Sequence, residues 1–277
     1  MPNDLDNRRR AFAEAVTVEA WHGDFSTGDG KVDLHADVVF GTARVGGEAQ
    51  SPVRFKLRIR QADVVVVIPN SEPVVVDTPS VSRDAPEFRA HLTETVQQSA
   101  RLYAIGQASA SASPKGVGAS LTGSVSAERG VGREAKVEVT GEMAVMAVTQ
   151  SKTSDGAYRW TIESVVDRHL IGRPWDAANA PRLKLIDQRK DRTKGIPPTV
   201  RVEVRCRRED IEIDEITLKD EPFWGKARAA LGYGNRIAAA ESYIRDQLIK
   251  EGLEVDNIAD AFGQLTLAST TAEEIID

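Results

Sequence analysis

The chain has a single cysteine, Cys206, among its 277 residues. One cysteine excludes an internal disulfide and a metal site built from several cysteines. A chain of this length without disulfides is typical of a reducing compartment, and we expect a cytoplasmic location. The N-terminal stretch carries Arg8, Arg9 and Arg10, and then Glu14 where a secretory signal has its apolar run. We therefore expect no signal peptide.

Aromatic residues are also scarce, at 5% of the chain. The core must therefore rest mainly on valine, isoleucine, leucine and alanine. No window of the sequence approaches the roughly 20 apolar residues of a transmembrane helix, so we expect none. The net charge of -6 and the isoelectric point near 5.4 argue against bulk nucleic-acid binding, which needs a basic surface.

The familiar catalytic signatures are missing. The chain has no Gly-x-Ser-x-Gly elbow, no glycine-rich phosphate loop and no His-Glu-x-x-His motif. Cys206 shares the apolar face of a predicted strand with Val202 and Val204, which indicates a buried thiol and not a nucleophile. A paired-carboxylate site stays open in the acid-rich residues 209–221, although solvated acids explain this stretch more simply. We expect no cofactor and favour a protein without enzymatic activity.

Apolar periodicity predicts strands over most of the chain. Residues 53–60 alternate most regularly, with an apolar face opposite a wholly basic one. Residues 64–68 are apolar on both faces, which is typical of a buried central strand. Further strands are predicted at residues 31–42, 74–76, 158–165, 182–186, 199–206 and 209–218.

Two longer stretches predict helices. Residues 84–104 place Phe88, Leu92 and Val96 at helical spacing after a plausible capping residue, Asp84. Apolar residues recur at intervals of three and four between Ala227 and Leu248, and Gly252 then supplies a signal for the helix end. We also predict a short helix near residues 256–265.

This order of elements predicts an α+β fold. We expect predominantly antiparallel β structure, as a sandwich or a strongly twisted sheet, with one helix inserted mid-chain and a C-terminal helical segment. Residues 1–222 would form the β-rich domain, including the helix near 84–104. Residues 223–277 would form a C-terminal helical segment packed on that domain.

Residues 103–149 alternate small polar residues with alanine and valine. The pattern predicts a long hairpin, turning at residues 130–132, with one weakly apolar face and one face of small polar groups. Such alternation is typical of membrane-inserting hairpins of pore-forming proteins, although aromatic girdles are missing. The alternative is a ribbon packed closely against another surface, or a template for strand addition or self-association.

Basic residues line one face of each of two predicted strands. If the two rows converged, they would form a surface that binds an anion or an acidic partner. The simpler interpretation is a solvent-exposed face on which cations protect the sheet edges. The candidate anion- or partner-binding residues are Arg54, Lys56, Arg58, Arg60, Arg201, Arg205 and Arg207.

Asp33, His35 and Asp37 would share one face of a strand. Two carboxylates and an imidazole within about 7 Å of strand length are suitable ligands for Zn, Mn or Fe. The alternative is a solvated face opposite an apolar one, because a metal site normally needs further ligands from elsewhere in the chain.

The sequence leaves three hypotheses for function. The first is a non-enzymatic intracellular protein that uses its sheet surface to bind a protein partner or to self-associate. The second is membrane insertion by the hairpin of residues 103–149. The third is a metal-dependent hydrolase that uses Asp33, His35 and Asp37.

Overall fold

The computed structural model describes residues 8–48, 51–83, 90–98, 135–143, 146–164, 169–191, 196–219 and 233–275. The chain divides into two compact units, each described here by itself. The larger unit comprises Met1–Pro86 and Met146–Asp277, and the smaller one Glu87–Val145. Within the described parts of the chain, no helix is long and apolar enough to cross a membrane.

The described residues of the larger unit form three sheets, which are antiparallel except for one short parallel pair, β16 with β2. The six-stranded sheet has the order β1 (Arg8–Arg10), β15 (Gln264–Thr271), β13 (Arg201–Arg207), β6 (Gln61–Val67), β11 (Tyr158–Ser164) and β10 (Met146–Lys152). The five-stranded sheet has the order β16 (Glu273–Glu274), β2 (Val16–His22), β3 (Lys31–Phe40), β12 (Leu183–Asp187) and β7 (Val74–Asp77). The three-stranded sheet has the order β14 (Ile211–Leu218), β5 (Val53–Ile59) and β4 (Ala43–Gly46).

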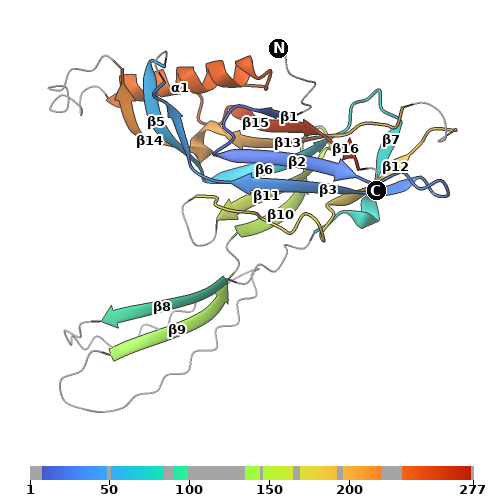
Figure 1. Cartoon of the computed structure of the whole chain (residues 1–277), viewed down its shortest axis with the longest axis horizontal. Coiled ribbons are helices and arrows are strands. Elements are labelled where there is room, and N and C mark those ends of the chain that lie inside the picture. Colours follow the sequence, from blue (N-terminus) through green and yellow to red (C-terminus); the bar gives the residue numbers. More distant parts are fainter. Residues whose placement is uncertain are drawn as a thin grey trace. The chain divides into compact units, whose positions relative to one another are not determined.

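The six- and five-stranded sheets pack as a sandwich, with β2 lying against β15 and β13 (Figure 1). Buried and less buried residues alternate strictly along β3, so that every second residue from Val32 to Phe40 faces the inside of the sandwich. Val64, Val65 and Val66 are all buried in β6, between β13 and β11. The prediction of a central strand at this place is therefore confirmed.

Two long bent strands join the sandwich to the three-stranded sheet. β5 continues into β6 across Arg60, and β13 continues into β14 across a short 3-10 turn, Arg208–Asp210. The bent strands pair along both parts, β6 with β13 and β5 with β14. At the bend, the Arg60 N–H donates to the Asp210 carbonyl at 2.8 Å.

One helix, α1 (Tyr233–Lys250), covers one face of the three-stranded sheet (Figure 1). It packs on the apolar face of β5, where the Phe55 and Tyr243 rings meet edge to face at 6.2 Å. Ile244 and Leu248 are fully buried. The prediction of a C-terminal helix is confirmed from Tyr233 onward, and Gly252 takes the left-handed conformation just beyond the helix end, at φ 68°.

The predicted mid-chain helix is wrong. Residues 90–98 form a strand, β8 (Ala90–Gln98), which pairs with β9 (Ala135–Met143) in the smaller unit. Leu92 and Val96 are four residues apart, an interval that keeps them on one face of a strand as well as of a helix. Three β-branched residues, Thr93, Thr95 and Val96, favour the strand.

Two further predictions change with the structure. Residues 256–263, which follow a single bridge at Val255, form turns and irregular backbone, and β15 begins at Gln264, so the short C-terminal helix is also wrong. The turn predicted at residues 130–132 lies outside the described residues, as does the whole of the predicted strand before it. The predicted second strand contains two described strands, β9, which pairs with β8, and β10, which pairs with β11.

Candidate anion-binding surface

The candidate site is the face of the three-stranded sheet opposite α1, called the outer face below. The alternation of β5 places Arg54, Lys56 and Arg58 on this face, while its apolar residues lie beneath the helix. Register sets their neighbours: Arg44 of β4 is opposite Lys56 on one side, and Asp214 of β14 is opposite Lys56 on the other.

Acidic residues of β14 neutralise one end of this basic row. Arg58 forms ion pairs with Asp214 and, at 3.4 Å, with Glu212. Lys56 lies 3.9 Å from the Glu215 carboxylate. Glu215 occupies a bulge between Asp214 and Thr217 and has φ 52°, a strained value for a residue other than glycine.

His169 extends the neutralised end. Its imidazole is hydrogen-bonded to the Glu212 carboxylate. Burial lowers the pKa of His169 from its ordinary value, and this effect outweighs the opposite pull of the Glu212 charge. The imidazole is therefore held mainly neutral, and the positive charge of Arg58 faces two carboxylates.

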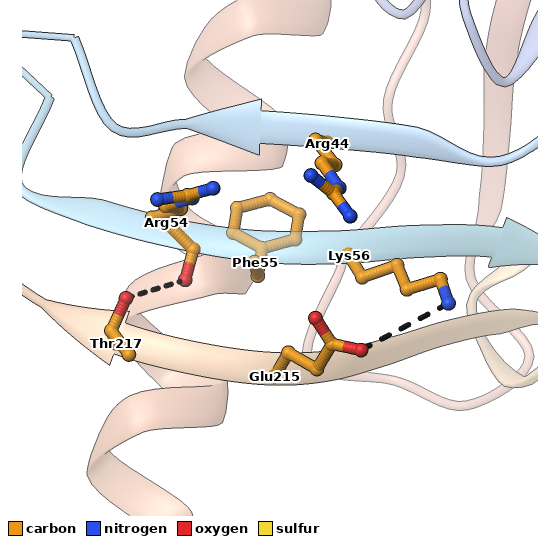
Figure 2. Close-up of a pocket in the computed structure, with 6 residues that line it drawn as sticks. All are labelled: Arg44, Arg54, Phe55, Lys56, Glu215 and Thr217. Carbon is orange, nitrogen blue, oxygen red and sulfur yellow. Dashed lines mark hydrogen bonds and ion pairs between the residues drawn. The ribbon is translucent and has the colours of Figure 1, made fainter.

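The other end of the row carries Arg44 and Arg54, which are both exposed. Figure 2 shows them on neighbouring strands, on either side of Phe55. Within the described ranges, neither guanidinium group makes an ion pair. With Lys56 and Glu215 they line a hollow of about 230 Å³ on the outer face, called the outer hollow below.

Local backbone geometry brings Arg54 to this hollow. The turn after β4 uses Gly46 and Gly47 in the left-handed region, at φ 74° and 90°. A Cβ atom on Gly47 would lie 3.0 Å from Arg54 Cδ, so the aliphatic part of the arginine lies directly on the glycine. Two guanidinium groups at one hollow can bind a carboxylate or a phosphate, each through paired N–H donors.

The second predicted basic row is already paired. Arg201 and Arg205 both contact the carboxylate of Glu203, at 2.6 and 2.7 Å, and Glu203 is only 3% exposed. Arg207 lies 3.4 Å from Glu209, whose carbonyl also accepts a hydrogen bond from Arg60. The two basic rows therefore approach each other at Glu209. There Arg207 lies near the Glu209 carboxylate, and Arg60 donates to the Glu209 carbonyl.

Asp33, His35 and Asp37 do share one face of β3, but each has a separate partner. Asp33 pairs with Lys184 at 2.9 Å, and Asp37 pairs with Arg173 at 2.9 Å. The His35 Nδ1–H donates to the Ala177 carbonyl at 2.7 Å, and its ring stacks on an indole. Over the part of the chain that the structure describes, no group of three His, Cys, Asp or Glu residues could hold a metal ion.

Sequence reasoning missed Arg44, Glu212 and Asp214 as members of the surface. A signal for Arg44 was present, because Ala43-Arg44-Val45 alternates just before a Gly-Gly turn and the basic strand. A hairpin at this place puts Arg44 beside Lys56. No comparable local signal links β14 to β5, which lies about 150 residues earlier in the chain.

No protein-family model matches the chain, and a search of curated proteins finds no significant similarity to it.

Proposed function

We propose that the protein is a non-enzymatic binding protein whose outer face receives an acidic segment of a protein partner. The observation that carries this proposal is the pair of exposed arginines, Arg44 and Arg54, at one hollow, without ion pairs in the described parts of the chain. The neighbouring cations Lys56 and Arg58 already face carboxylates of β14. An external acid is therefore expected at the Arg44–Arg54 end.

The affinity should be modest and sensitive to salt. Exposed ion pairs contribute about 0.2–1 kcal/mol each, and salt screens them over about 10 Å at 0.1 M. A guanidinium group gains more from a carboxylate than an ammonium does, because it can donate two parallel hydrogen bonds. Specificity would then come from the spacing of the two arginines.

The experiment measures fluorescence anisotropy of a fluorescein-labelled decaglutamate peptide at low salt. Reversing both charges, in Arg44→Glu/Arg54→Glu, should weaken binding by about tenfold or more. The matched control is Arg245→Glu/Lys250→Glu, which reverses two exposed cations on α1 behind the same sheet. The control should bind as the wild type does.

Two results would overturn the proposal. One is equal binding by the wild type and Arg44→Glu/Arg54→Glu. The other is a wild type that binds no decaglutamate at low salt. A labelled single-stranded oligonucleotide and inorganic phosphate serve as competitors, and displacement by the oligonucleotide alone would replace the protein partner with a nucleic acid. Light scattering at several protein concentrations tests whether the partner is a second copy of the chain.

A second candidate is membrane insertion by the region that contains residues 103–149. The observation in its favour is the antiparallel ribbon of β8 and β9 in the smaller unit, with nine residues in each strand. About nine to eleven residues allow a tilted strand to cross a bilayer. Dye release from liposomes of several lipid compositions tests the candidate, and no leakage between pH 5 and pH 8 would remove it.

A further inference from the structure

β4 is an edge strand, because the three-stranded sheet ends there. The Arg44 N–H donates to the Glu14 carboxylate at 3.2 Å and not to β5. In an antiparallel pair, the residues alternate between those bonded to the partner strand and those whose main-chain groups face away. The N–H and C=O of Arg44 therefore face away from β5.

A second hollow, of about 200 Å³, lies beside the same edge on the side of α1. Phe12, Val45 and Tyr243 contribute its apolar and aromatic wall, and Glu14 and Glu48 contribute carboxylates. Ligand pockets usually have about 300 Å³ or more, so this helix-side hollow suits one side chain better than a whole small molecule.

The two hollows lie on opposite faces of one edge strand, and Arg44 lines both. Successive side chains of an extended strand point to opposite faces. A strand paired with β4 would therefore send one residue toward Arg44 and Arg54, and the next into the helix-side hollow. The arginines favour an acidic side chain in the outer hollow, whereas Glu14 and Glu48 disfavour one in the helix-side hollow.

We propose that β4 is a docking edge for an extended peptide of the partner protein, in which acidic and apolar residues alternate. The inference rests on the proposed function and specifies the form of its ligand. A carbonyl of the peptide would replace Glu14 as the acceptor for the Arg44 N–H, and a peptide N–H would donate to the Arg44 carbonyl. Main-chain pairing then supplies affinity, and the two hollows supply the order of side chains.

The first test compares labelled nonapeptides by fluorescence anisotropy. One alternates five glutamates with four valines, and a second has the same composition with the valines grouped together. The alternating peptide should bind about tenfold more tightly, because only it can make main-chain hydrogen bonds and fill both hollows. A third peptide repeats the alternating sequence with N-methyl groups on every second backbone nitrogen, and it should lose this advantage.

The second test fills the helix-side hollow. Ala13 is exposed on its wall, so Ala13→Trp should occupy the space without disturbing the core. This variant should bind the alternating peptide no better than the grouped one, while its affinity for decaglutamate stays at the wild-type level. Retained decaglutamate binding also shows that the variant is folded.

The outcomes separate this inference from the proposed function. Equal binding of the alternating and grouped peptides overturns strand docking, and so does an N-methylated peptide that binds as well as the parent. An alternating peptide that keeps its advantage in Ala13→Trp overturns the part played by the helix-side hollow. If decaglutamate still binds in these cases, the proposed function stands. If no acidic peptide binds, both fall.

Discussion

Truncation of Leu248 should destabilise the protein strongly, because this side chain lies between α1 and the three-stranded sheet. Leu248 is fully buried, and α1 packs on both β5 and β14. Leu248→Ala removes three heavy atoms and leaves a cavity, at a cost of about 2–5 kcal/mol. For a protein of this size each kcal/mol lowers Tm by about 2–4 °C, so we expect a fall of about 4–20 °C.

The neighbouring residue provides the control. Ile249 is on the same helix but is 59% exposed. Ile249→Ala should change the free energy of unfolding by less than about 0.5 kcal/mol. Urea unfolding followed by circular dichroism measures both variants. If Leu248→Ala unfolds at the same urea concentration as Ile249→Ala, α1 does not support the sheet, and the placement of the outer face opposite it loses its basis.

Four further predictions concern the charged and titratable groups. Arg58→Glu should lower the free energy of unfolding by about 1–2 kcal/mol because it adds an acid beside two carboxylates, while Arg54→Glu should change it by less than about 0.5 kcal/mol in the same urea titration. Burial lowers the pKa of His169 from 6.5. The contribution of this residue to stability is therefore present above pH 6.5 and is lost as the pH falls toward the lowered pKa. Urea titrations at several pH values should show a smaller loss of stability at low pH in His169→Gln than in the wild type. Burial lowers the pKa of Arg182 to about 10, and no ion pair to it occurs within the described ranges, so Arg182→Met should match or exceed wild-type stability whereas Arg182→Ala should fall below it. Burial raises the pKa of the Cys206 thiol, and the thiol should react with a disulfide reagent only after unfolding in urea.

Local alternation allowed the face of β5 to be predicted from the sequence, but it does not show which charges meet across strands. Arg54, Lys56 and Arg58 share a face because the period of a strand is two residues. Their different surroundings depend on the register with β14, which is distant in sequence, and on the bulge that shifts this register after Asp214. Periodicity alone does not reveal such a shift.

The same limit explains the elements that were assigned wrongly. The spacing of Phe88, Leu92 and Val96 fits one face of a helix or of a strand, and the pairing of residues 90–98 with β9 decides between them. β15 shows no alternation, because residues 265–270 are buried on both faces between β1 and β13. Pairing with β1 and β13, and not a local sequence pattern, makes these residues a strand.

We propose that Arg44 and Arg54 form the binding end of the outer face. The most direct measurement is NMR of the arginine Nε–Hε groups of the wild-type protein during titration with decaglutamate at low salt. We predict that the signals of Arg44 and Arg54 shift and saturate together, while those of Arg58 and Arg205, which already face carboxylates, stay in place. Shifts confined to Arg58 or Arg205, or no arginine shift at saturating peptide, would show that Arg44 and Arg54 do not bind the acidic peptide.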